Sequence, residues 1–214
     1  MACGGARDER GLDRLVFFSD AVVAIAITLL ALEIHLPDLR TASDIPEALV
    51  KLWPQYFGYA ISFLVVGSFW YGHHRMFRVV GRYDDVLLWL DLLFLLCIAF
   101  IPFASSVLGD YPGERSAVVF YSVVMIATGL VESLLWAYAT YAHRLIGSSV
   151  SERTIRIQTL RNLMPPVVFA LALPLTFISP YLAFAAWLAI YVILMLLLRV
   201  ERRPLTASAP TDEE

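Results

Sequence analysis

An arginine and an aspartate stand six residues apart at the start of an otherwise apolar stretch, RLVFFSDAVVAIAITLLALEI, at residues 14–34. Arg14, Ser19 and Asp20 lie near its beginning and Glu33 near its end. A carboxylate within a membrane segment costs several kcal/mol unless it is paired or hydrated. We therefore expect Asp20 to meet a hydrogen-bond donor on another helix.

Donors for this carboxylate are available in a second apolar stretch. Trp70 and His73 lie near its end, at a depth that matches Asp20. An indole N–H donates, and a histidine donates through a ring nitrogen. We expect the Ser19/Asp20 pair to contact Trp70 or His73, and the Arg14 side chain is long enough to join them. The simplest role for such contacts is to hold the helices in register.

The remaining reactive side chains do not predict catalysis or metal binding. His73 and His74 are adjacent, and adjacent helical residues point about 100° apart, so they make a poor chelate. The two cysteines form no CxxC or Cys/His cluster. Ser105 and Ser106, the candidate nucleophiles, are expected at the opposite side of the membrane from the histidines. The sequence therefore predicts no enzyme, no metal and no cofactor.

Helical geometry separates the polar residues of the first stretch from an apolar stripe. Ser19 and Asp20 lie about 120° and 140° from the direction of Ile25, at about 100° per residue. The other members of the stripe lie within about 60° of Ile25: Phe18, Thr28, Leu29 and Leu32. The helix thus has one mostly apolar side and one side that presents a hydroxyl and a carboxylate.

These residues must be positioned by membrane-spanning helices. The chain has 214 residues, of which 59% are hydrophobic and 16% charged, which indicates an all-α, multi-pass protein of the cell membrane in contact with lipid. A span needs roughly 20 apolar residues. Six spans are expected at about residues 12–36, 54–74, 86–108, 116–142, 163–178 and 181–198. Pro37 ends the first span, and the polar segment before the fifth is expected to hold a short surface helix at most.

The basic residues support an even number of spans with both termini in the cytoplasm. Of the 16 Lys and Arg, only Arg40, Lys51 and Arg115 fall on the outer side. Residues 1–11 form a cytoplasmic N-terminus, 12–199 a six-helix transmembrane domain, and 200–214 a polar cytoplasmic tail expected to be disordered. No DNA-binding motif predicts a nucleic-acid partner, and no TVGYG-type sequence predicts a carbonyl filter.

Two further carboxylates lie deep in the expected spans. Asp91 in the third span is expected to be bonded within the bundle. Glu132 stands near the middle of the fourth span, beside Gly129 and Ser133. An intramembrane carboxylate is a candidate for function, although helix–helix contact is the simplest role for Glu132.

Three segments together resemble the transmembrane protein 175 family of potassium channels. The motif R-x-x-x-F-S-D comprises Arg14, Phe18, Ser19 and Asp20, followed by AVVAIAITLLALEI. SFWYGHHRMF at residues 68–77 and LDLLFLLCIAFIPFASSVL at residues 90–108 also match. The resemblance covers the first three spans, and the remaining spans agree mainly in number and hydropathy.

The resemblance implies an architecture. Animal members carry two six-span repeats, and prokaryotic members carry one and assemble as homotetramers, so a homotetramer is implied here. The first helix of each subunit would line a central pore with Ile25 as the apolar constriction. Thr28 would bear on selectivity, and Leu29 and Leu32 would extend the narrow zone. The network implied to support the pore helix comprises Arg14, Phe18, Ser19, Asp20, Trp70 and His73.

The resemblance, together with the apolar stripe, therefore favours a tetrameric, non-canonical channel that conducts K⁺ with modest selectivity over Na⁺. Fourfold symmetry turns Ile25 into a ring that restricts passage by width and dewetting, without coordinating an ion. The alternative is a proton-coupled secondary transporter that uses intramembrane carboxylates such as Asp20 and Glu132. Such a transporter would show a pH-driven, saturable flux that is lost on Asp20→Asn.

Overall fold

The computed structural model describes residues 5–37, 41–141, 145–147 and 150–200. These residues form a helical bundle, which confirms the expected all-α class; the extended pairing found among them is one isolated antiparallel bridge, Val80↔Ile146. The α-helices and 3-10 helices (η) are α1 Gly5–Leu32, η1 Ala42–Asp44, α2 Ile45–Lys51, α3 Trp53–Phe77, α4 Asp85–Asp110, α5 Arg115–Thr140, α6 Glu152–Ala172, η3 Leu173–Phe177 and α7 Pro180–Val200.

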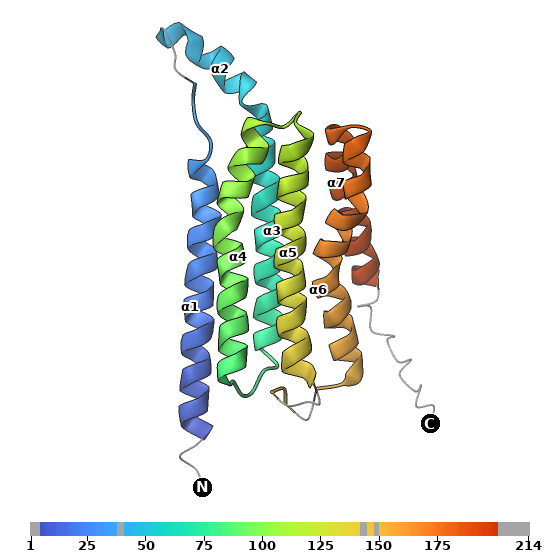
Figure 1. Ribbon diagram of the computed structural model, residues 1–214. Helices are drawn as coiled ribbons and strands as arrows, with labels where there is room; N and C mark the ends of the chain where they lie inside the picture. Colours follow the sequence, from blue (N-terminus) through green and yellow to red (C-terminus); the bar gives the residue numbers. More distant parts are fainter. Residues whose placement is uncertain (1–4, 38–40, 142–144, 148–149, 201–214) are drawn as a thin grey trace, which may run out of the picture.

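The long helices lie side by side (Figure 1). In this view α1, α4, α5 and α6 follow one another across the bundle, with α3 behind α4 and α5 and with α7 packed against α6. Among the described helices, α1 contacts only α4 and α3. The short α2 leaves the bundle at 48° to α3. The first helix is thus at the edge of the bundle, with one side packed and the rest uncovered.

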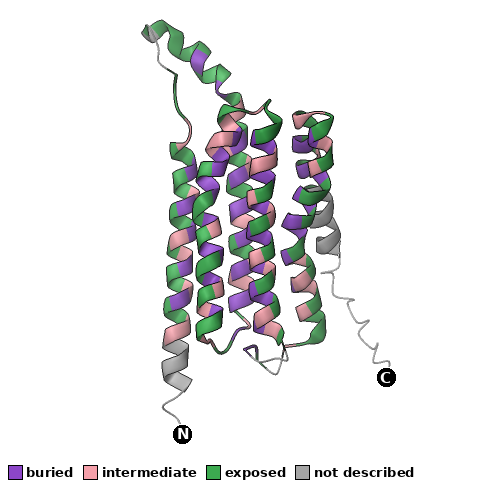
Figure 2. Cartoon of the chain, in the orientation of Figure 1, coloured by how far each residue is buried: buried purple, intermediate pink, exposed green. Residues whose placement is uncertain are grey.

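Large apolar side chains fill the space between the helices. Phe69 of α3, Ile98 of α4 and Met125 of α5 are fully buried in the main core. Figure 2 shows buried residues along the inward faces of the helices and exposed ones along the outer faces. At the end where α3 meets α4 and α5 meets α6, the connecting loops pair through Gly81 N–H, which donates to Leu145 O at 2.9 Å.

The first helix differs from its expected span of residues 12–36 at both ends, since it begins at Gly5 and ends at Leu32. The first span was expected to reach residue 36, but α1 ends at Leu32, and residues 34–37 are irregular. Pro37 disfavours helical geometry at the residue before it, and the backbone N–H of His35 instead donates to Gln55 Oε1 at 3.1 Å. The chain therefore leaves the helix one turn early.

The expectation of at most a short surface helix before the fifth span was wrong. The long α6 begins at Glu152, with Ser151 as its N-cap accepting from Thr154 N–H at 3.2 Å. Its polar residues Gln158 and Asn162 are buried against neighbouring helices. Polar residues of this kind are typical of loops, and for this reason the sequence did not indicate a long helix here.

Four helices of the described chain are long and apolar enough to cross a membrane: the one ending at Leu32, α4, α5, and α6 with η3. A fifth is counted if the bent pair α2 and α3 forms one span, and the apolar part of α7 found by the same test is shorter, at Pro180–Ala189. The end of the bundle that holds the 78–84 loop and the start of α6 carries Arg78, Arg82 and Arg153, whereas Arg115 lies at the other end.

Candidate pore helix and its polar contacts

One face of α1 packs into the bundle. Leu15, Ser19, Val23, Ala26 and Leu30 are buried, at intervals of three and four residues that keep them on one side of a helix. Their neighbours are α4 and α3. Four of the five are apolar, so packing supplies most of this interface and Ser19 supplies a polar contact within it.

The predicted stripe lies on the uncovered side of the same helix. Phe18, Ile25, Leu29 and Leu32 are 40% to 67% exposed. Thr28 is also exposed, and its hydroxyl donates to the carbonyl of Ile25 at 2.8 Å. That bond leaves the lone pairs of the threonine oxygen available on the exposed surface. A run of large apolar side chains along an uncovered helix indicates a surface that meets lipid or another protein chain.

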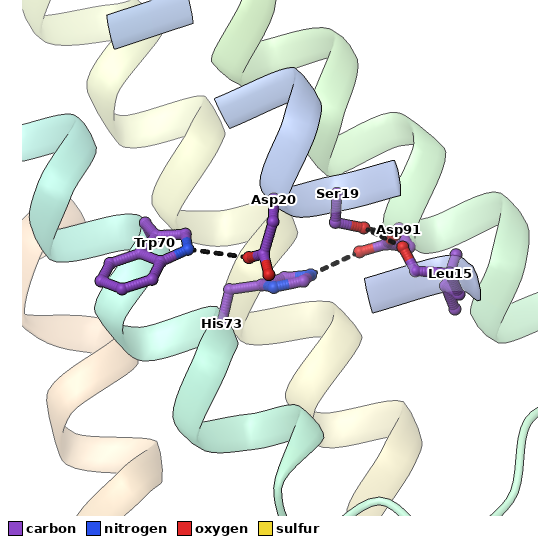
Figure 3. Close-up of polar contacts among 6 residues, drawn as sticks. All are labelled: Leu15, Ser19, Asp20, Trp70, His73 and Asp91. Carbon is purple, nitrogen blue, oxygen red and sulfur yellow. Dashed lines mark hydrogen bonds and ion pairs between the residues drawn. The ribbon is translucent and has the colours of Figure 1, made fainter. Parts of the chain in front are cut away.

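Asp20 is bound from α3. The indole Nε1–H of Trp70 donates to Asp20 Oδ1 at 2.8 Å (Figure 3). The Trp70 ring in turn stacks on His74, with ring centroids 5.5 Å apart. Trp70 is one of the two donors expected from the sequence, and its bond joins α1 to α3.

Ser19 is bound from α4. Its hydroxyl lies 2.7 Å from Asp91 Oδ2 and 2.9 Å from the carbonyl of Leu15, so its single proton is shared between these acceptors. The other carboxylate oxygen, Asp91 Oδ1, lies 2.7 Å from His73 Nε2. With Asp91 as a carboxylate, which only accepts, His73 would donate through Nε2–H. Ser19, Asp91 and His73 are at most 1% exposed.

Aromatic packing fixes the histidine of this chain of contacts. The His73 ring stacks on Phe94 of α4 at 5.3 Å between centroids, with only 8° between the planes, and lies 4.5 Å from the Phe77 ring. Ser19 therefore reaches α4 and, through Asp91, α3, while Asp20 reaches α3 directly. Figure 3 shows both contacts at the same level of α1. Two contacts in different directions oppose rotation of α1 about its axis.

The other expected members of the network are placed differently. Arg14 is exposed, and among the described residues it makes no hydrogen bond or ion pair. With Phe18 it lines a groove of about 580 Å³ between α1 and α4, opposite Asp85 and Trp89. The sequence predicts that Asp91 is bonded within the bundle, but it does not indicate Ser19 as the partner. Its position deep in an apolar helix was the available signal.

Comparison with known proteins identifies the family. A family model described as the endosomal/lysosomal potassium channel TMEM175 matches residues 14–102, which include every residue of the two contacts above. A potassium channel of Streptomyces collinus is 36% identical over 177 residues, covering 81% of this chain and 86% of the relative. This chain belongs to the TMEM175 family.

Solved and animal members of the TMEM175 family extend the comparison. The crystal structure of a lysosomal potassium-selective channel TMEM175 homolog from Chamaesiphon minutus matches with a TM-score of 0.76 and 28% identity, covering 88% of this chain and 98% of that one. A human relative, named as the endosomal/lysosomal proton channel TMEM175, is 28% identical over 189 residues; the match covers 82% of this chain and 38% of the human protein. These names describe ion channels and not enzymes.

Proposed function

We propose that this TMEM175-family protein is a multi-pass membrane channel that conducts K⁺ with modest selectivity over Na⁺, and is not an enzyme. The observation that carries the proposal is the exposed apolar stripe of α1, which is turned away from the packed face that holds Ser19. Membership of the family and the names of its relatives are the reason for proposing K⁺ as the conducted ion. The stripe is the surface available for lining a path, because Ser19 and Asp20 are turned toward α4 and α3.

We further propose a homotetramer of six-span subunits with both termini in the cytoplasm. In this arrangement α2 with α3 counts as one span and α7 as another. The edge position of α1 supports this assembly, since four copies can place their first helices around one axis without unpacking the subunits. The basic end of the bundle would face the cytoplasm.

In such a tetramer Ile25 would form the constriction. A ring of four isoleucines restricts passage by its width and by expelling water, and it offers an ion no ligand. Phe18, Leu29 and Leu32 would line the path on either side. Thr28 would add a ring of hydroxyl oxygens one turn from Ile25, which suits modest discrimination between K⁺ and Na⁺ better than strict selection.

The test is cation flux from proteoliposomes of purified protein, measured for K⁺ and for Na⁺. The variants are Ile25→Ala and the matched control Leu171→Ala, a leucine that is 62% exposed on α6, away from α1. We expect the natural protein to pass K⁺ faster than Na⁺, Ile25→Ala to raise Na⁺ flux, and Leu171→Ala to behave like the natural protein.

Two results would overturn the proposal. If the natural protein passes neither ion and Ile25→Ala changes nothing, α1 does not line a pore. If flux instead saturates, follows a pH gradient and disappears in Asp20→Asn, the protein is the proton-coupled transporter considered above. Mass measurement of the detergent-solubilised protein tests the tetramer independently.

A further inference from the structure

A second polar cluster lies inside the subunit, between α3, α5 and α6. Glu132 of α5 and Gln158 and Asn162 of α6 are each at most 3% exposed. The Gln158 amide nitrogen Nε2 lies 2.8 Å from Asn162 Oδ1 and 3.3 Å from the carbonyl oxygen of Gly72 on α3. Glu132 Oε1 and Asn162 Nδ2 have no hydrogen-bond partner among the described residues.

The carboxyl group of Glu132 points at the backbone of α3. A Cβ atom placed on Gly72 would lie 2.5 Å from Glu132 Oε1 and 3.5 Å from Asn162 Oδ1. The absence of a side chain at Gly72 is therefore what admits the carboxyl group to this position. The carboxyl group of Glu132 on α5 and the side-chain amide of Asn162 on α6 therefore both lie beside Gly72 of α3.

Two prolines of α6 leave backbone carbonyl oxygens near Glu132 without an N–H donor. Pro165 and Pro166 lie inside α6. A proline has no N–H, so the carbonyl four residues earlier receives no helical hydrogen bond. For Pro166 that carbonyl belongs to Asn162. In membrane helices such carbonyls are satisfied by neighbouring side chains or ordered water.

Pro166, toward which the carbonyl of Asn162 points along the helix, lies on the side of α6 that faces α5. Pro166 packs directly on Gly129, since a Cβ there would lie 2.4 Å from the proline Cδ. Glu132 follows Gly129 by one turn on α5, and Asn162 precedes Pro166 by one turn on α6. The two antiparallel helices therefore bring Glu132 to the level of the backbone oxygen that Pro166 leaves free.

The groups around Glu132 determine whether its carboxyl group is ionised or neutral. The ion pairs found among the described residues, Lys51–Glu47 and His73–Asp91, do not include Glu132, and its Oε1 has no hydrogen-bond partner. An ionised carboxylate at this depth would cost several kcal/mol without a partner. A neutral carboxylic acid has an O–H to donate, and Asn162 O is an acceptor that lacks a donor.

We propose that Glu132 is a buried proton-binding site: it is held as a neutral acid that donates its proton, directly or through one water molecule, to the α6 carbonyl freed by Pro166. The ligand is a proton, and the site is separate from the exposed face of α1. The bound proton joins α5 to α6 beside Gly72, the residue before His73. It thereby stabilises the part of α3 that contacts Asp20 and Asp91.

Infrared difference spectroscopy of the membrane-reconstituted full chain in H₂O and D₂O tests this proposal. A neutral carboxylic acid has a carbonyl stretching band, distinct from the bands of a carboxylate, that shifts in D₂O. We expect this band at neutral pH in the natural protein, its loss in Glu132→Gln, and its retention in the matched control Glu114→Gln, an exposed glutamate at the start of α5. Identical spectra for the natural protein and Glu132→Gln would overturn the proposal.

A second variant tests the acceptor and does not depend on Glu132→Gln folding. Pro166→Ala restores an N–H donor to the carbonyl of Asn162 and keeps the contact with Gly129 small. We expect the Glu132 band to move to higher frequency, because its proton loses its acceptor. A band that stays in place would overturn the assignment of the acceptor. Neither spectrum depends on ion conduction, so failure here is distinguishable from failure of the proposed channel function.

Discussion

Replacing Ser19 by alanine should weaken the attachment of α1 to the bundle by a predictable amount. The serine is fully buried, and its hydroxyl lies 2.7 Å from Asp91 Oδ2. Its removal leaves that buried carboxylate with His73 as its remaining side-chain partner. Hydrogen bonds to charged groups contribute about 1.5–3 kcal/mol in proteins, and polar contacts between membrane helices reach about 1.7 kcal/mol. We expect a loss of about 1.5 kcal/mol, or roughly tenfold in the unfolding equilibrium constant.

The chain offers a close control for this measurement. Ser122 of α5 is also fully buried, and its hydroxyl donates to the carbonyl of Val118 at 2.8 Å. Ser19 makes the equivalent contact with Leu15 at 2.9 Å. Ser122→Ala therefore removes a buried hydroxyl and a bond within one helix but no contact between helices. We expect it to change the free energy of unfolding by at most about 0.5 kcal/mol.

The assay is the free energy of unfolding in mixed micelles, followed by circular dichroism as denaturing detergent is added. A double-mutant cycle of Ser19→Ala with Asp91→Ala should give a coupling energy of about 1 kcal/mol or more, because the two residues share one bond. Equal losses for Ser19→Ala and Ser122→Ala, with no coupling to Asp91, would refute the reasoning. The contact between Ser19 and Asp91 would then contribute no measurable free energy to the stability of the protein.

Two further substitutions test the packing of the bundle. Gly129→Ala should destabilise the protein by about 1–3 kcal/mol, because the new Cβ would lie 2.4 Å from Pro166 and the helices must separate. The control is Gly67→Ala, whose new Cβ would meet nothing within 4 Å. In the same unfolding titration it should be neutral or stabilising by up to about 1 kcal/mol. Trp70→Phe keeps the aromatic ring but removes the donor to Asp20 and should cost about 1 kcal/mol. A Trp70→Phe protein as stable as the natural one would show that water replaces the indole at this partly exposed site.

Much of the architecture follows from the sequence because membrane thickness sets the length of an apolar helix. The expected spans at residues 86–108 and 116–142 agree with α4 and α5 to within two residues at each end. The exposed stripe follows from the period of a helix alone. The start of α6, where the expectation was wrong, lies where polar residues are buried. Gln158 and Asn162 face α3 and α5, and no hydropathy pattern distinguishes such residues from a loop.

For the site residues, the sequence predicts the direction in which each side chain points, and the tertiary structure determines which partner it meets. The sequence by itself determined that Ser19 and Asp20 point about 100° apart and away from Ile25, because the turn per residue is a property of any α-helix. The tertiary structure decided which neighbour each one meets: Asp91 of α4 for Ser19, and Trp70 of α3 for Asp20. The physical reason is that α1 lies against two helices at once. The partner of each side chain depends on how these three helices pack, and that packing is set by apolar contacts distributed along the whole of each helix.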